Sequence, residues 1–158
     1  MTRIASVFVL LAATLGLGGC ATLGAPYTPD AAVPANHAAV YVYRISTMGA
    51  AIAPTVTANK VPLLTLPPSG YFVYYAAPGE LTLEQKTEST TSVTLDIKAG
   101  DTYYVKGSIG MGFFVGHPHL VIVSKDDGAK EILACKLVPG SVPTAEMVAA
   151  GPPPKPAK

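Results

Sequence analysis

The central part of the chain, residues 38–138, is divided into apolar segments of four to eight residues, each ended by a turn signal. These segments are rich in Val, Tyr, Thr and Leu, which favour strands, and they fall short of the about ten residues a typical helix needs. The 15 Gly and 15 Pro residues of the chain supply the turns. We therefore expect an all-β fold, an antiparallel β-sandwich of about seven to eight strands.

Three pairs of these segments are separated by short turn sequences, and each pair is predicted to form a β-hairpin. In the first pair Asn59-Lys60 makes a two-residue loop, and Asn tolerates the positive φ that such a loop requires. Pro78-Gly79 and residues 99–101 supply the other two turns. The paired segments are 55–58 with 61–66, 71–76 with 81–86, and 93–97 with 103–106.

Residues 93–97 alternate apolar and polar side chains, as a half-buried strand does. We expect Leu95 to face the core, while Thr94 and Asp96 face water. The other side chains expected to face the core here are Val93, Ile97, and Leu81 and Leu83 from the preceding strand.

The last segments of the domain are less regular. Residues 120–123 are apolar on both faces, which predicts a central strand. Residues 126–128 (Asp-Asp-Gly) are predicted to turn the chain toward a strand at 132–138, in which Leu133, Cys135 and Leu137 would share one face. A helical turn at 129–133 is the alternative.

The N-terminus has the features of a secretory signal peptide over residues 1–19. Arg3 is followed by an apolar run of 12 residues at 4–15, shorter than the roughly 20 that a membrane-spanning helix needs. Leu17-Gly18-Gly19-Cys20 resembles the lipobox of bacterial lipoproteins. The alternative is an ordinary signal peptide with an incidental cysteine.

The lipobox resemblance implies that Cys20 is acylated and becomes the first residue of the mature protein. Several acyl chains hold a small domain on a membrane far more firmly than one chain does. In that family an Asp after the cysteine retains the protein in the inner membrane, and here that residue is Ala21. The resemblance therefore implies the outer membrane of a Gram-negative cell, with the domain facing the periplasm.

Proline-rich segments flank the domain on both sides. Residues 20–37 carry Pro26, Pro29 and Pro34 and are predicted to be an extended tether behind the lipidated Cys20. Residues 139–158 are predicted to be a disordered tail, in which a short helix at 144–150 is possible. The expected domain organisation is therefore a signal peptide at 1–19, the tether at 20–37, the sandwich at 38–138 and the tail at 139–158.

Several motifs together resemble a known family. Residues 56–62, 70–72 and 77–83 are similar to the hairpins of PEGA-type β domains, with a Pro-Gly turn between alternating strands. With residues 40–44, 98–105 and 110–116 added, the chain resembles small bacterial lipoproteins that carry a domain of unknown function. The resemblance spans residues 38–137 and implies an immunoglobulin-like or prealbumin-like sandwich, but no activity.

The charge balance excludes some kinds of partner. The chain has 11 Lys and Arg against 10 Asp and Glu, a formal net charge of +1. Removal of Arg3 with the signal peptide would leave the mature chain neutral. A domain without a positive field is poorly suited to nucleic acid, so no nucleic-acid partner is expected.

His117 and His119 are the only pair of side chains with metal-ligand spacing that the sequence suggests. On an extended strand they point the same way, and Cys135 or Met111 would be a soft third ligand that favours copper. Two ligands do not make a site, and exposed histidines without a metal are the alternative. We therefore expect no metal and no cofactor, and keep copper binding or small-ligand binding as the alternative function.

Cys135 has no partner for an intrachain disulfide once Cys20 is acylated. It is expected to be buried as a small apolar residue, because it stands between Leu133 and Leu137. The alternative is an intermolecular disulfide.

The glycine-rich segment 107–116 surrounds Met111, Phe113, Phe114 and Val115 with four glycines. It lacks the Lys and the helix onset of a phosphate-binding loop. Either its aromatic rings plug the end of the sandwich, or it is an exposed apolar loop that contacts lipid or a partner protein. We assign these four apolar residues to partner binding.

The carboxylates of the domain lie in turns or at outward strand positions, and no spacing pairs a general acid with a base. The sequence therefore predicts a protein that is not an enzyme. We expect an outer-membrane lipoprotein that acts as a binding or assembly module for envelope proteins.

Overall fold

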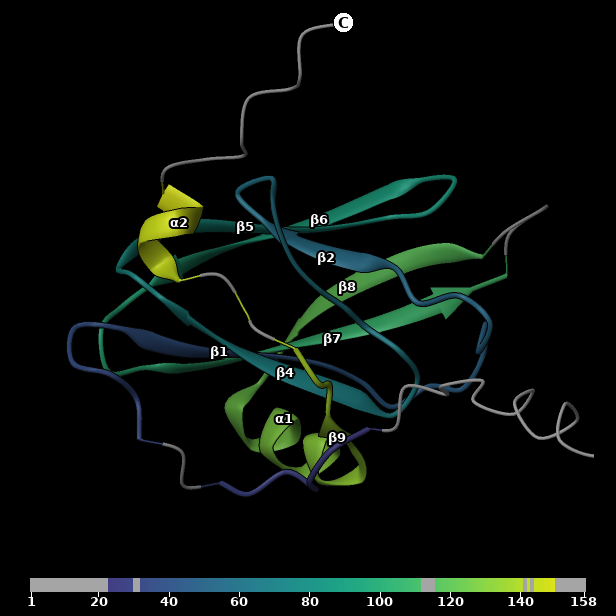
Figure 1. Cartoon of the computed structure of the whole chain (residues 1–158), viewed down its shortest axis with the longest axis horizontal. Coiled ribbons are helices and arrows are strands. Elements are labelled where there is room, and N and C mark those ends of the chain that lie inside the picture. The colour runs from purple at the N-terminus through teal and green to yellow at the C-terminus, as the bar shows by residue number, and fades with distance from the viewer. Residues whose placement is uncertain (1–22, 30–31, 112–115, 141, 143, 150–158) are drawn as a thin grey trace, which may run out of the picture.

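Two β-sheets pack face to face in the computed structural model, which confirms the all-β sandwich (Figure 1). The structure describes residues 23–29, 32–111, 116–140, 142 and 144–149. The five-stranded sheet has the order β8 (His117–Val123), β7 (Thr102–Gly110), β1 (Ala38–Arg44), β4 (Gly70–Ala76) and β9 (Lys136–Leu137). The four-stranded sheet has the order β3 (Val61–Thr65), β2 (Thr55–Ala58), β5 (Gly79–Lys86) and β6 (Thr90–Ile97).

The five-stranded sheet is covered on both faces, so the domain has three layers. Strand β1 is buried along its whole length. Its Val40 and Val42 belong to the core between the two sheets, whereas Tyr41 and Tyr43 belong to a second core on the outer face. Helix α1 (Lys125–Glu131) and the 3₁₀ helix Ile132–Ala134 lie over that outer face (Figure 1).

The sheet that contains β1 is mixed, which differs from the expected antiparallel arrangement. Strand β1 pairs antiparallel with β4 but parallel with β7, and β9 also runs parallel to β4. Both parallel pairs are possible because the connections cross to other layers of the domain before the chain returns.

One of the three predicted hairpins is confirmed. Strands β2 and β3 are joined by Asn59 and Lys60, which have φ of 46° and 70°, the left-handed values that a two-residue hairpin loop needs.

The other two predicted hairpins are wrong, because β4 and β5, like β6 and β7, belong to different sheets. The actual hairpins are β5 with β6 and β7 with β8. Strand β4 is buried on most of both faces, which suits the covered sheet, whereas β5 and β6 alternate and have one solvent face. Burial on both faces therefore places β4 next to β1 and separates it from β5.

The predicted alternation along β6 is confirmed. Leu95 is buried and lies opposite Leu81, while Thr94 and Asp96 are exposed. Ile97 is also buried, and Val93 packs against the core from its edge.

Strand β8 is an edge strand, so the prediction of a central strand at 120–123 is wrong. It pairs with β7 alone among the described residues, and Val121 and Ile122 are exposed. Leu120 faces the core, whereas Val121 and Ile122 form an apolar surface that is open to solvent.

The predicted turn at 126–128 and the predicted strand at 132–138 are also wrong, and the helical alternative is closer. Ser124 caps α1 by accepting a hydrogen bond from the Asp127 amide. After the 3₁₀ helix only β9 remains extended, so the expected shared face is absent: Leu133 is exposed and Cys135 is buried.

Parts of both flanking segments pack on the domain. The Gly24 amide donates to the Leu137 carbonyl at 2.7 Å, and Tyr27 is buried in the second core. The short helix expected at 144–150 is present as α2 (Ala145–Ala149), and its Val148 reaches the main core. The domain therefore extends beyond residues 38–138 at both ends.

None of the helices within the described ranges is long and apolar enough to span a membrane. Cys20 and the rest of residues 1–22 lie outside those ranges.

Candidate functional site

One end of the sandwich gathers the features that the sequence singled out. Strands β1 and β7 finish there, at Arg44 and Gly110, and β4 and β8 begin there, at Gly70 and His117. We call this end of the five-stranded sheet, with residues 45–54 and Met111, the loop end. Helix α2 lies at the opposite end, beside residues 76–81 (Figure 1).

Arg44 organises the loop end. Its side chain is fully buried, and its guanidinium donates to the carbonyls of Met48 (2.6 Å), Ile52 (2.7 Å) and Gly49 (3.0 Å). Desolvation lowers the pKa of Arg44. No carboxylate within 4.0 Å neutralises it among the described residues, so backbone dipoles alone solvate the charge.

Two further carbonyls, those of Ser46 and Leu66, complete the acceptors of Arg44. Residues 45–54 are thereby wrapped around one buried cation, which holds their backbone in a single arrangement. Sequence reasoning missed this role. The available signal was a single charged residue at the end of an otherwise apolar strand.

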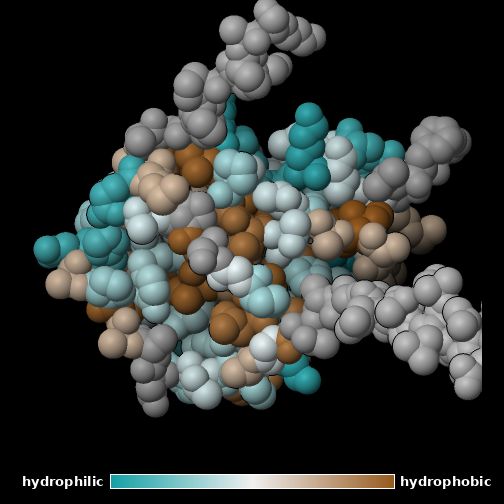
Figure 2. Space-filling view, viewed as in Figure 1, coloured by the Kyte–Doolittle hydropathy of each residue, from teal (hydrophilic) through white to brown (hydrophobic). Residues whose placement is uncertain are grey.

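The loop end presents apolar side chains to solvent. Met48 is 57% exposed, Met111 is 88% exposed, and Ile45 is also exposed. In Figure 2 apolar side chains gather at this end, on the right of the view. Of the predicted partner-binding residues, Met111 is therefore on the surface, while Phe113, Phe114 and Val115 lie outside the described residues.

Gly110 and Gly116 in the segment 107–116 serve close packing. A Cβ on Gly116 would overlap the Ile109 side chain, and one on Gly110 would lie 2.9 Å from Nε2 of His119. The Gly116 carbonyl also accepts a hydrogen bond of 2.7 Å from the Thr87 hydroxyl. These contacts tie the segment to β7, β8 and the β5–β6 turn.

His117 and His119 both lie on β8 and are both exposed. His117 already has two neighbours: its Nδ1 is 2.9 Å from the Ser89 hydroxyl, and its Nε2 is 3.9 Å from a Glu88 carboxylate oxygen. The described residues contain no group of three or more His, Cys, Asp or Glu side chains placed to hold a metal.

Cys135 is buried, as predicted, and lies in the second core. Its thiol donates a hydrogen bond of 3.7 Å to the Arg44 carbonyl, and burial raises its pKa to about 11. A neutral, enclosed thiol of this kind is not a nucleophile. It also cannot serve as a third metal ligand beside the exposed histidines.

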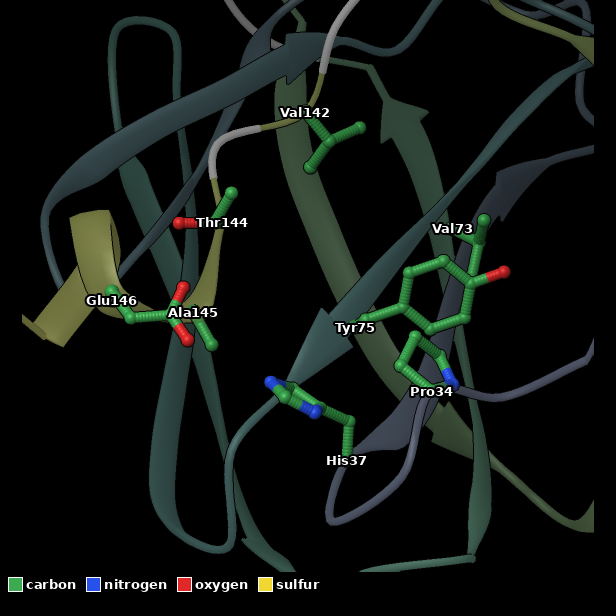
Figure 3. A pocket seen from close by; sticks show the side chains of 8 residues that line it. All are labelled: Pro34, His37, Val73, Tyr75, Val142, Thr144, Ala145 and Glu146. Atoms are coloured by element: carbon green, nitrogen blue, oxygen red, sulfur yellow. The ribbon is translucent and has the colours of Figure 1, made fainter.

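A pocket of about 270 Å³ lies at the opposite end of the domain, where both flanking segments meet β4 (Figure 3). Pro34, Val73 and Tyr75 form one wall, and His37 and Glu146 approach from the other side (Figure 3). A hydrogen bond from the Thr144 hydroxyl lowers the pKa of Glu146.

A second hollow of about 290 Å³ is lined by aromatic rings. Tyr27 and Tyr104 share a hydrogen bond of 3.2 Å between their hydroxyls, and Tyr41 stacks on Tyr104. Burial raises the pKa of Tyr27 above its ordinary value, so the Tyr27 phenol stays neutral and serves packing.

The comparisons with known proteins point to one family. Residues 34–118, more than half of the chain, match the model of a protein family of unknown function, DUF2846. The chain belongs to the DUF2846 family. No curated protein sequence matches it.

The DUF2846 match covers a defined part of the structure. It begins just before β1 and ends within β8, so it includes Arg44, residues 45–54 and Met111. Helix α1, Cys135 and α2 follow the match. Apart from β9, the loop end thus lies in the matched DUF2846 region, and the helical cover of the outer face follows that region in the sequence.

Proposed function

We propose that this DUF2846 protein is an outer-membrane-anchored periplasmic lipoprotein that serves as a non-enzymatic binding or assembly module for envelope proteins. The lipobox-like residues Leu17-Gly18-Gly19-Cys20, followed by Ala21, support the anchor and its destination. The small β-sandwich, with one sheet edge formed by β8, supports a domain used for contacts.

The observation that carries the binding function is the open edge of β8. Val121 is 52% exposed and its neighbour Ile122 is 48% exposed, so apolar side chains emerge on both faces of one edge strand. The β5–β6 turn is bonded to the start of β8 through Thr87 and Ser89, and β6 packs close to β8, but no described strand pairs with its outer edge. A strand from a partner can pair with such an edge, with main-chain hydrogen bonds for affinity and these side chains for specificity.

Met111, together with Phe113, Phe114 and Val115, is proposed as a second contact surface. Met111 supports this by its exposure, and the other three contribute apolar side chains in the same segment of the sequence.

Affinity capture of the intact lipoprotein from its native membrane tests the binding function. Ile122→Lys should abolish co-purification of the protein captured by the wild type and leave the melting temperature unchanged, because a charged edge strand resists pairing. Thr94→Lys, an exposed position on β6, is the matched control. Equal capture by Ile122→Lys and wild type would reject the β8 edge as the contact surface.

Cell fractionation of Cys20→Ser tests the anchor separately. The variant should leave the membrane fraction or accumulate as an unprocessed precursor. A variant that fractionates and migrates like the mature wild type contradicts the lipoprotein assignment.

The alternative proposal is copper or small-ligand binding at His117 and His119, which the exposure of both imidazoles on one strand favours. Native mass spectrometry with Cu²⁺ decides it. A stoichiometric adduct that disappears in His117→Ala/His119→Ala supports copper binding, and equal uptake by both proteins ends it.

A further inference from the structure

We propose that the loop end lies against the lipid bilayer, with Ile45, Met48 and Met111 at the boundary between headgroups and acyl chains. The inference rests on the proposed acylation of Cys20. It names the partner of the apolar surface at this end as the membrane itself.

The length of chain between the anchor and the domain is the first step. The Gly24 amide donates to the Leu137 carbonyl at 2.7 Å, and the Leu137 amide donates to the Ala25 carbonyl at 2.8 Å. Only four residue steps separate Cys20 from Gly24, which span at most about 14 Å when fully extended. The lipid therefore attaches within about 14 Å of a backbone that is bonded to the sheet.

The position of Gly24 on the domain is the second step. Its partner Leu137 pairs with Tyr71, the second residue of β4, and Gly70 pairs with Arg44. Gly24 is therefore attached at the level of the loop end. The other end of β4, at Ala76, is about 17 Å further along the strand, which is more than the about 14 Å that residues 20–24 can span, so the anchor stays on the side of the loop end.

The chemistry of this end is the third step. Residues 45–54, 66–69 and 107–111 contain no Asp, Glu, Lys or Arg. A surface without charges enters the membrane interface without the cost of desolvating ions, and its exposed apolar side chains gain free energy there.

The buried Arg44 fits the same use. Its bonds to the carbonyls of Met48, Gly49 and Ile52 hold the loop in shape, so the loop need not be ordered when it meets lipid. Lys86 and Glu88 belong to the β5–β6 hairpin of the other sheet, and the exposed Lys136 of β9 pairs with Gly70. The uncharged part is the loop at residues 45–54 together with Met111.

Two methionines of equal exposure at opposite ends of the domain provide a matched test. Met48 is 57% exposed at the loop end, and Met147 is 58% exposed on α2. Met48→Cys and Met147→Cys are made in the full chain, processed in cells, purified and labelled with an environment-sensitive fluorophore. Wild type is the labelling blank, because the Cys20 thiol would be acylated and Cys135 is buried.

The labelled proteins are reconstituted into vesicles of phosphatidylethanolamine and phosphatidylglycerol, with or without lipids that carry a quencher on the upper acyl chain. We expect the Met48→Cys label to shift to the blue and to be quenched at least threefold more than the Met147→Cys label. Met111→Cys should behave like Met48→Cys. Equal quenching of the Met48→Cys and Met147→Cys labels, or quenching of neither, overturns the inference.

Flotation of the same samples separates this inference from the proposed function. If labelled protein fails to float with vesicles, the anchor at Cys20 is absent and both proposals fail. If it floats while the Met48→Cys label stays unquenched, the anchor stands and only the orientation is rejected. A Met48→Cys label that is shielded in native membranes but unquenched in pure vesicles assigns this end to a protein partner and also rejects the inference.

Discussion

The hydroxyl of Tyr43 donates a hydrogen bond of 2.6 Å to Oε2 of Glu131, across 88 residues of sequence. The ammonium of Lys106 donates to the other carboxylate oxygen at 2.9 Å. The Tyr43 bond, followed by the Lys106 bond, lowers the pKa of Glu131, and burial together with Glu131 raises that of Tyr43. This carboxylate fastens the end of α1 to strands β1 and β7.

Tyr43→Phe should reduce the free energy of unfolding by about 1 kcal/mol at neutral pH, because it removes one charge-assisted hydrogen bond to a partly exposed carboxylate. The folded pKa of Glu131 lies below its unfolded value, so this stabilisation is complete above the unfolded pKa of about 4.3 and is lost as the pH falls through the folded pKa. Urea unfolding at pH 7 and pH 3 should show a smaller difference from wild type at pH 3. In the Glu131→Gln background the effect of Tyr43→Phe should not depend on pH. A Tyr43→Phe penalty that is the same at both pH values in the wild-type background contradicts the assignment.

Arg44→Met should destabilise the domain by about 3 kcal/mol or more, because several carbonyls of residues 45–54 lose a charged donor in a buried place. Hydrogen exchange should accelerate in residues 45–54 before it does so in β1. Lys130→Met, which removes an exposed charge from α1, is the control and should leave both measurements unchanged. Unchanged exchange in the loop of Arg44→Met would show that Arg44 does not brace it.

Leu95→Asp should prevent folding, because it places a carboxylate without a partner between the sheets, opposite Leu81. Thr94→Asp, one residue away on the solvent face, should melt within a few degrees of wild type. Circular dichroism and thermal melting distinguish the two. A cooperative melt of Leu95→Asp near the wild-type temperature would mean that the register of β6 is wrong.

Gly128→Ala should destabilise the protein, although the same change in an exposed helix stabilises it by about 1 kcal/mol. A Cβ at this position would overlap Tyr104, which packs directly beneath α1. In the Tyr104→Ala background the substitution should become neutral or stabilising, and chemical unfolding of the four proteins of this cycle measures the coupling. Additive effects would show that the contact is not the reason for the glycine.

Cys135 should resist alkylation in the native protein at pH 8 and react at an ordinary rate in denaturant. Burial raises its thiol pKa to about 11, so the thiolate is scarce and also enclosed. Mass spectrometry after iodoacetamide treatment, with and without urea, measures this. Rapid native alkylation, or a dimer that reducing agent dissolves, contradicts the burial.

Local patterns predicted the parts of the fold whose causes are local. The Asn59-Lys60 turn followed from the residue types that accept positive φ, and the inward position of Leu95 followed from alternation along one strand. The burial of Cys135 was also correct, although the strand assumed for it is mostly helical. The candidate site was predicted only as far as Met111, since the role of Arg44 depends on carbonyls from three separate parts of the backbone.

The sequence by itself determined the all-β class, the short strands and their turns, because side-chain period and turn chemistry act over a few residues. Only the tertiary structure decided which strands pair. Strand β4 pairs with β1, and not with β5 as expected, because both β4 and β1 must be covered on two faces. It also placed Gly24 on β9 at the end where Arg44 holds an uncharged loop. That juxtaposition joins residues far apart in sequence, and no local pattern encodes the distance between them.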